Sequence, residues 1–224
     1  MKVAIIGAGF TGLAAAYDLV QRKYETTVFE SESRPGGLAI GFKEPEWKWS
    51  LESHYHHLFT SDNSIIDLAN EVDHKLNYLN PVSSTYVNGK IVKLDSPIDV
   101  LKFNELPLID RTRLGVGLSY LKYNPFWKPL ENITAYTFIE KVMGNKVWKM
   151  LWGPLFYHKF GNYSKEIAAS WFWARIKKRS KDLIYPEGGF TSLAQKIREE
   201  TEKLGGKFFF STKVNIVGIS SVVL

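Results

Sequence analysis

The stretch that most constrains the fold stands at the start of the chain, in the residues MKVAIIGAGFTG. Val3–Ile6 is a short apolar run of mostly branched residues, which is typical of a buried parallel strand. Gly7, Gly9 and Gly12 follow it directly with the spacing G-x-G-x-x-G. An alanine-rich segment, Leu13–Arg22, comes next and is expected to be helical. A glycine-rich turn between a strand and a helix is the setting in which this spacing predicts a phosphate-binding loop.

A second strand is expected at Thr26–Glu30 and completes a βαβ unit of about 30 residues. In such a unit Gly7 permits the tight turn, Gly9 lets the backbone approach a pyrophosphate, and Gly12 allows close packing of helix on strand. The helix then presents its free N–H groups to the phosphates. Glu30 can accept hydrogen bonds from both hydroxyls of an adenosine ribose, and it would repel a 2′-phosphate. The sequence therefore predicts a dinucleotide other than NADP.

The residues after Glu30 indicate which of the two cofactors, FAD or NAD, is bound. They read SESRPGG and give the spacing E-x-x-x-R-x-G-G. This spacing resembles the second signature of the superfamily of flavin amine oxidases, protoporphyrinogen oxidases and phytoene desaturases. The resemblance implies that Arg34, Gly36 and Gly37 lie against the pyrophosphate of FAD. A guanidinium fork binds phosphate oxygens, and paired glycines let the backbone come close.

A later segment, YPEGGFTSLAQKIREETEKLGGKFFFSTKVNIVGI, carries the same resemblance. In the family a Gly-Gly turn leads to a helix, a glycine and a strand that ends in a valine. The resemblance implies that Val214 contacts the adenine of FAD through its backbone. We expect the helix to be capped by Thr191 and to end at the glycine pair 205–206, with strands in KFFFSTKVNIVGI.

The resemblance covers Met1–Phe59 and Tyr185–Ile219, and the nearest members are prokaryotic proteins similar to protoporphyrinogen oxidase. Leu38 departs from the Arg or Asn that many members carry, and this weakens an assignment to UDP-galactopyranose mutase. No segment matches the C-terminal one that closes the flavin site, so we expect the N-terminal portion of a longer protein. The predicted FAD-binding residues are Gly7, Ala8, Gly9, Phe10, Thr11, Gly12, Glu30, Ser31, Arg34, Gly36, Gly37, Leu38 and Val214.

The stretch SHYHH at 53–57 offers three histidines to a metal ion. No carboxylate is well placed beside them, and strand alternation would put His54 and His56 on one face and His57 on the other. No metal site is therefore predicted. By the resemblance this stretch lies near the flavin ring, so Tyr55, His56 and His57 are candidates for lining the substrate pocket. Plain packing or surface roles are the alternatives.

The middle of the chain, from about Ser96 to Lys181, is rich in aromatic residues and lysine and has helical spacing. Before it, Asn-Gly within Tyr86–Val92 predicts a two-residue hairpin turn. The predicted fold class is α/β, with a Rossmann-like FAD-binding sheet in two sequence segments, residues 1–82 and 186–224. A mainly helical substrate domain is inserted between them at 83–185.

The chain is basic, with 29 lysine and arginine residues against 23 acidic ones and a net charge of +6. WFWARIKKRSK at 171–181 joins aromatic to basic residues. A solvated charge beside core aromatics, a contact with a membrane surface or an anionic substrate, and nucleic-acid binding all fit this pattern. The last is disfavoured because no nucleic-acid-binding motif accompanies it. The absence of cysteine excludes disulfides and thiolate catalysis and suits a cytoplasmic protein.

The expected function is FAD-dependent oxidation or desaturation of a small or lipid-like organic substrate. Nucleic-acid partners are not expected, peripheral membrane contact is an open alternative, and no catalytic side chain is predicted. Two other classes remain. One is a non-redox sugar mutase similar to UDP-galactopyranose mutase, and the other is a truncated or vestigial module without catalytic activity.

Overall fold

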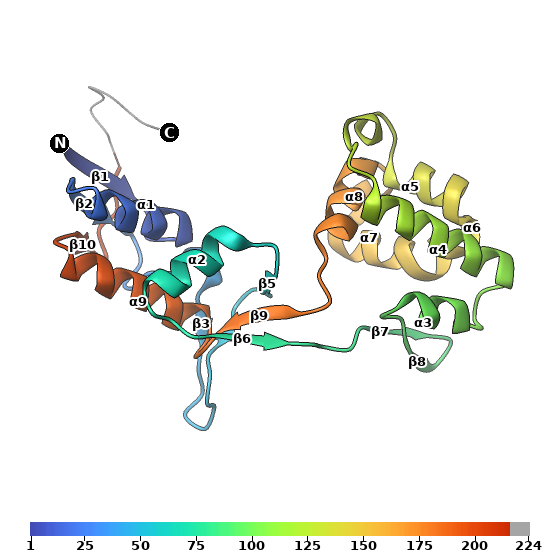
Figure 1. Ribbon diagram of the computed structural model, residues 1–224, viewed down its shortest axis with the longest axis horizontal. Coiled ribbons are helices and arrows are strands. Elements are labelled where there is room, and N and C mark those ends of the chain that lie inside the picture. The colour runs from blue at the N-terminus through green and yellow to red at the C-terminus, as the bar shows by residue number, and fades with distance from the viewer. Residues whose placement is uncertain (216–224) are drawn as a thin grey trace. The chain divides into compact units, whose positions relative to one another are not determined.

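The computed structural model describes residues 1–215 of the 224-residue chain (Figure 1). It divides into two compact units. Unit 1 consists of Met1–Leu79 and Asp182–Leu224, and unit 2 consists of Asn80–Lys181. The ends of the chain therefore belong to one unit and the middle to the other.

A parallel sheet forms the base of unit 1. It contains β1 (Lys2–Ile6), β2 (Glu25–Phe29) and β10 (Lys207–Phe209), with β2 in the centre. The register pairs Val3 with Thr26 and Lys207 with Thr27. β1 and β2 are joined through α1 (Phe10–Gln21), and β10 follows α9 (Phe190–Lys203). The predicted α/β class and the first βαβ unit are confirmed.

Helix α1 packs against α9, and the two bury the core of this layer. Leu13, Ala16 and Val20 of α1 are almost fully buried, as are Leu193 and Ile197 of α9. Small residues on α1 allow the helices and the sheet to approach closely, which agrees with the alanine-rich sequence.

Two predicted details of the helices are wrong. Helix α1 begins at Phe10, three residues before the predicted start, because the N–H of Leu13 already bonds the carbonyl of Gly9 at 2.9 Å. Thr191 does not cap α9, since Gly189, with φ +90°, is the cap residue. The Thr191 hydroxyl instead accepts a hydrogen bond from the N–H of Gly41 at 2.9 Å. The predicted end of α9 before the glycine pair 205–206 is confirmed.

The strand content after α9 is smaller than predicted. β10 ends at Phe209, and residues 210–215 form no strand. Ser211 adopts a left-handed φ of +53°, and its N–H bonds the carbonyl of Glu32 at 2.9 Å. Thr212 N–H bonds the carbonyl of Glu30 at 2.8 Å, so the chain turns around the end of β2. The rest of the predicted strands, 216–219, lies outside the described residues.

Unit 1 also contains an antiparallel sheet and a short hairpin. β9 lies between β5 and β6 in the sheet, and β3 pairs with β4 in the hairpin. These elements and the helices beside them are η1 (Gly37–Ala39, 3₁₀), β3 (Gly41–Phe42), β4 (Leu51–Glu52), β5 (Leu58–Phe59), α2 (Asn63–Glu71), β6 (Leu76–Leu79) and β9 (Leu183–Pro186).

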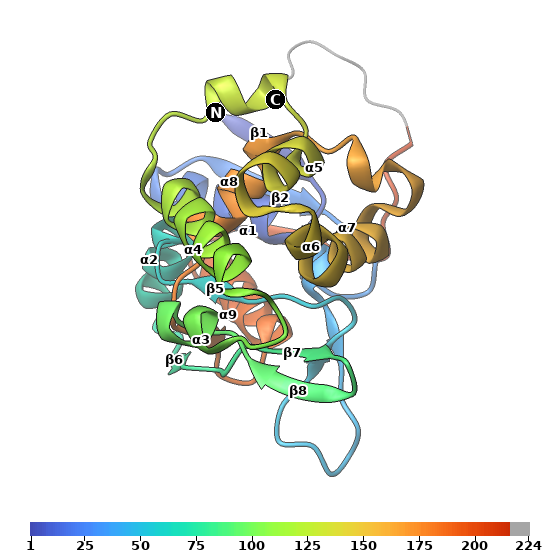
Figure 2. The ribbon, with the colours of Figure 1, turned by 90° about the vertical axis from the view of Figure 1, so that its right-hand side faces the viewer.

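Unit 2 is mainly helical, with a hairpin at its start (Figure 2). The hairpin turn has φ +49° at Asn88 and +77° at Gly89, which confirms the predicted two-residue turn. The elements are β7 (Ser84–Val87), β8 (Lys90–Lys93), α3 (Pro97–Lys102), α4 (Leu108–Tyr123), η2 (Lys128–Asn132, 3₁₀), α5 (Ala135–Phe138), η3 (Ile139–Met143, π), α6 (Asn145–Val147), η4 (Trp148–Trp152, π), α7 (Gly153–Phe160), η5 (Gly161–Lys165, 3₁₀) and α8 (Ala169–Lys178).

The core of unit 2 is built from large apolar side chains on these helices. At most 1% of the surface is exposed in each of Phe103, Leu114, Leu121, Met143 and Phe172. Many of the aromatic residues of the middle segment therefore serve to pack one helix on another. Among residues 1–215, no helix combines the length and the apolar character needed to cross a bilayer.

Candidate cofactor site

The first glycine loop makes a tight turn at the end of β1. Gly7 has φ +97°, and its N–H bonds the carbonyl of Phe29 at 2.8 Å. A Cβ atom on Gly12 would lie 2.0 Å from the carbonyl oxygen of Gly7. No side chain fits in that space, so glycine at position 12 lets the first turn of α1 lie against the strand end.

The second glycine segment lies beside the first. The N–H of Gly36 donates to the carbonyl of Ala8 at 2.9 Å, and Gly36 and Gly9 form an isolated parallel β-bridge. Gly37 has φ +57°, and a Cβ atom on it would lie 3.1 Å from the Cα of Gly9. Arg34, just before this contact, is exposed. Two glycine segments almost 30 residues apart in the sequence thus form one surface of bare backbone at the start of α1.

The N-terminus of α1 belongs to the same surface. Gly9 is its cap residue, and no side chain caps the helix there. Phe10, Thr11 and Gly12 make up the first turn of this 12-residue helix. The N–H groups of a first helical turn have no partner within the helix and attract anions. The glycine surface therefore suits a phosphate group.

Glu30 is the buried carboxylate of this region, with 8% of its surface exposed. One oxygen accepts from the N–H of Ala8 at 2.5 Å. The other accepts from the N–H of Glu32 at 2.9 Å and from the Ser31 hydroxyl at 3.1 Å. Burial by itself raises the pKa of Glu30, but the hydrogen bonds from Glu32, Ala8 and Ser31 outweigh it, so the net pKa lies below its ordinary value.

A cavity of about 160 Å³ opens between the glycine loop, the end of β2 and the chain after β10. It brings together four residues predicted from the sequence, which are Gly7, Glu30, Ser31 and Val214. The full lining consists of Ile6, Gly7, Phe29, Glu30, Ser31, Thr212, Lys213 and Val214. Three segments far apart in the sequence therefore converge on one buried carboxylate.

The stretch at 53–57 is not a strand, since β4 ends at Glu52 and β5 begins at Leu58. The expectation that alternate histidines face opposite sides is therefore wrong. The His57 ring lies 5.0 Å from the Tyr55 ring, and the His56 ring lies 5.8 Å from that of Phe190. Within residues 1–215, no three histidine or acidic side chains are grouped to hold a metal ion.

Most of the chain is similar in sequence to known proteins. The sequence profile of the family described as "Flavin containing amine oxidoreductase" matches residues 10–221. The chain belongs to this family. The match confirms both the predicted superfamily and its flavin cofactor.

Individual proteins are also similar to the chain. Coproporphyrinogen III oxidase of Staphylococcus aureus is 27% identical over 214 residues, which cover 90% of this chain and 44% of that enzyme. Zeta-carotene desaturase of Solanum lycopersicum is 30% identical over 132 residues, which cover 53% of this chain and 22% of that enzyme. The structure of reduced UDP-galactopyranose mutase has a TM-score of 0.67 and 21% identity, covering 92% of this chain and 48% of that one.

The chain thus spans less than half the length of each of these proteins. The likeness to the mutase, at 21% identity, shows the fold alone. Within this family context, the glycine surface, Glu30 and the cavity beside it fit the adenosine and pyrophosphate parts of FAD. Backbone N–H groups are the donors that a phosphate requires, and a carboxylate is an acceptor suited to ribose hydroxyls.

Several residues of these sites were not predicted. The cavity is also lined by Ile6, Phe29, Thr212 and Lys213, and only their nearness in sequence to Gly7, Glu30 and Val214 could have indicated them.

Tyr185 on β9 is a further residue that the sequence did not predict. Burial, a hydrogen bond to Tyr55 and the charge of Glu52 raise its pKa to about 12, so its hydroxyl stays protonated. Nothing near Tyr185 in the sequence predicts that it meets Tyr55.

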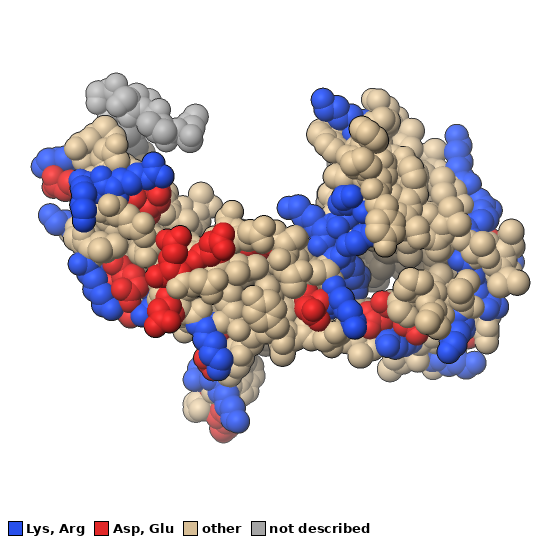
Figure 3. Space-filling view, viewed as in Figure 1, with Lys and Arg blue, Asp and Glu red and all other residues tan. Residues whose placement is uncertain are grey.

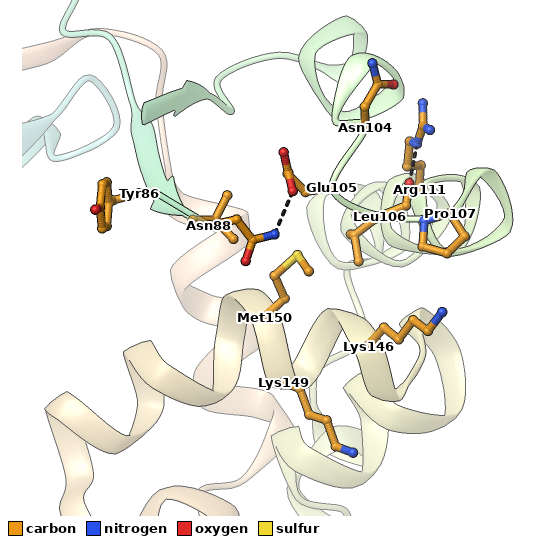
Figure 4. Close-up of a pocket in the computed structure, with 11 residues that line it drawn as sticks. Tyr86, Asn88, Asn104, Glu105, Leu106, Pro107, Arg111, Lys146, Lys149 and Met150 are labelled. Atoms are coloured by element: carbon orange, nitrogen blue, oxygen red, sulfur yellow. Dashed lines mark hydrogen bonds between the residues drawn. The ribbon is translucent and has the colours of Figure 1, made fainter. Parts of the chain in front are cut away.

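A larger cavity, of about 920 Å³, lies within unit 2 (Figure 4). None of the predicted cofactor or pocket residues lines it. Leu106 and Met150 give it apolar walls, and the Glu105 carboxylate accepts a hydrogen bond from the Asn88 amide at 2.6 Å. Lys146 and Lys149 point away from this carboxylate and from each other. Their charges therefore do not converge on a common anion site.

Proposed function

We propose that this chain is the FAD-binding portion of an FAD-dependent oxidoreductase that oxidises or desaturates an organic substrate. One observation carries the proposal. Gly7, Glu30 and Val214 line one cavity, and the second glycine segment lies against the first beside it. The family match supports a flavin, and the arrangement suits its nucleotide half.

The proposal gives each part of this site a role. The pyrophosphate lies at the N-terminus of α1, against the bare backbone of Gly9 and Gly37, with Arg34 reaching its oxygens. Glu30 accepts hydrogen bonds from the ribose hydroxyls. Oε2 accepts only from Ala8 and has room for one hydroxyl, and Oε1 can accept the other when the Ser31 hydroxyl turns away from it. The adenine lies in the cavity beside the backbone of Val214.

The chemistry comes from the flavin, which accepts a hydride or electrons from the substrate when it is bound. The residues of this chain bind and orient it. In our proposal the FAD-binding sheet is assembled from residues 1–82 and 186–224, and the inserted segment 83–185 is the substrate domain. Tyr55, His56 and His57 remain candidates for lining the substrate pocket, and the half-buried Tyr185 beside Tyr55 joins them. The substrate is a small or lipid-like organic molecule, as the names of the related oxidase and desaturase indicate.

A non-redox sugar mutase is the second candidate, because the fold is similar to that of UDP-galactopyranose mutase. Leu38, exposed at 76%, replaces the asparagine usual in that enzyme and argues against it. A full-length protein that needs reduced FAD for turnover, without net oxidation of its substrate, would identify a mutase. Net reduction of the flavin by a substrate would identify an oxidoreductase.

Replacing Arg34 with alanine tests the phosphate role. We expect FAD to bind about 10 to 100 times more weakly, since a hydrogen bond to a charged group contributes about 1.5–3 kcal/mol. The Arg34 side chain is exposed, so the free energy of unfolding should change little. Quenching of flavin fluorescence in a titration measures the affinity.

Arg22→Ala is the matched control, because Arg22 is an exposed arginine at the far end of α1 and pairs only with Asp18 among the contacts described. It should leave FAD affinity unchanged. If the wild type and the Arg34 variant bind FAD with equal affinity, Arg34 does not contact the phosphates. Tight binding of NADH without FAD binding would contradict the proposed function as a whole.

A further inference from the structure

Unit 2 is far more basic than the chain as a whole. Residues Asn80–Lys181 contain 17 lysine and arginine residues and 7 acidic ones, a net charge of +10. The whole chain has a net charge of +6, so the remainder is net acidic. A charge concentrated in one unit attracts an anionic partner to that unit.

Part of this charge gathers at the C-terminal end of α8. Arg175, Lys177 and Lys178 lie in its last turns, and Arg179 and Lys181 follow. In Figure 3 lysine and arginine side chains cluster over this end of the helix. The Lys177 ammonium donates to the carbonyl of Tyr123 at 3.4 Å, and the Arg175 guanidinium lies 5.9 Å from the centre of the Trp171 ring. Neither contact neutralises the positive charge.

An exposed aromatic segment, Tyr123–Trp127, lies next to this basic end. Tyr123 is 79% exposed, Phe126 is 72% exposed and Trp127 is 39% exposed. Large aromatic side chains usually contribute to a core or an interface, because leaving them in water forgoes the free energy of burial. Three of them within five residues indicate a surface that is covered by a partner.

Hydrogen bonds hold the aromatic segment against α8. The indole N–H of Trp173 on α8 donates to the carbonyl of Asn124 at 2.8 Å. The ammonium of Lys122 donates to the carbonyls of Lys177 and Arg179, at 3.1 and 2.6 Å. The aromatic rings and the basic side chains therefore belong to one rigid surface.

The segment itself is also fixed. The Asn124 amide donates to the carbonyl of Phe126 at 2.9 Å, and Asn124 Oδ1 accepts from the Phe126 N–H at 3.0 Å. Neither of the two cavities described above includes any residue of the segment. Exposed aromatic rings of this kind can enter the interface of a bilayer, and no nucleic-acid-binding motif accompanies them.

We propose that the aromatic segment and the basic end of α8 form a docking surface for an anionic lipid bilayer. Aromatic rings favour the interface between headgroups and acyl chains, and lysine and arginine attract anionic headgroups. The inference does not depend on the flavin site, which lies in unit 1.

Co-sedimentation of the chain with lipid vesicles tests this docking surface. We expect binding to vesicles of phosphatidylcholine mixed with phosphatidylglycerol, weaker binding to pure phosphatidylcholine, and release by salt. The double variant Phe126→Ser/Trp127→Ser should bind at least about ten times more weakly, because it removes the apolar contact. Lys178→Gln should weaken binding about fivefold, as one cation near an anionic surface contributes about that factor.

Tyr86→Ser is the matched control, since Tyr86 is 76% exposed and lies in β7. The β7–β8 hairpin and the connection from α4 to η2 lie at opposite ends of unit 2 in both views (Figures 1 and 2). This variant should bind vesicles like the wild type, and a thermal melt should show that every variant is folded. The proposal is overturned if anionic vesicles do not bind, or if Tyr86→Ser loses as much binding as the double variant. Binding of single-stranded DNA without binding of vesicles would overturn it in favour of a nucleic-acid partner.

Discussion

An alanine at position 12 is expected to destabilise unit 1 by about 3 kcal/mol. Its Cβ atom would lie 2.0 Å from the carbonyl oxygen of Gly7, and both groups belong to the backbone. The clash can be relieved only by moving the first turn of α1 away from β1. Urea unfolding followed by circular dichroism measures the loss. A Gly12→Ala protein as stable as the wild type would contradict the packing described here.

Gly9→Ala is the matched comparison, and it should separate folding from binding. Gly9 has φ −69°, which alanine readily adopts, and a Cβ atom there would meet only the Cα of Gly37, at 3.9 Å. The free energy of unfolding should therefore change by about 1 kcal/mol or less. The added methyl group would occupy the place proposed for the pyrophosphate, so FAD affinity should fall at least about tenfold. Unchanged affinity in a flavin titration would place the phosphates elsewhere.

Glu30→Ala is expected to weaken FAD binding at least about tenfold, because two ribose hydrogen bonds to a charged group are lost. The variant should also be less stable by about 2 kcal/mol, since it leaves the fully buried N–H of Ala8 without its acceptor. Glu32→Ala is the control, because Glu32 is exposed and contributes its N–H rather than its carboxylate to the site. If both variants bind FAD equally well, Glu30 does not hold the ribose.

The lowered pKa of Glu30 also sets the pH range of this effect. A carboxylate with a folded-state pKa below its unfolded value of 4.5 stabilises the fold fully above that value. The contribution is lost as the pH falls through the folded pKa. The difference in unfolding free energy between the wild type and Glu30→Gln should therefore be constant from pH 6 to 8 and shrink below about pH 4.5.

Local patterns in the sequence predicted the elements that depend on neighbouring residues. The branched run before Gly7 forms β1, the alanine-rich segment forms α1, and Asn88-Gly89 forms the turn of a hairpin. Each of these depends on propensity or on backbone angles that a few adjacent residues determine. The convergence of Glu30 with the glycine loop follows from the order of strand, helix and strand.

The details that failed depend on contacts between distant parts of the chain. Thr191 cannot be recognised as a partner of Gly41, because 150 positions separate them. The early end of β10 follows from hydrogen bonds of Ser211 and Thr212 to the loop after β2. The hydrogen bond between Tyr55 and Tyr185 joins two segments that no periodicity connects. Tertiary contacts of this kind override local preference.

A thermal melt with FAD or NAD tests the central claim, that this chain binds FAD, most directly. We predict that FAD at about 100 times its dissociation constant adds about 2.7 kcal/mol of stability and raises the melting temperature by several degrees. NAD at the same concentration should raise the melting temperature less, because it shares only the adenosine and pyrophosphate of FAD and lacks the flavin ring. A shift with NAD and none with FAD would contradict the claim.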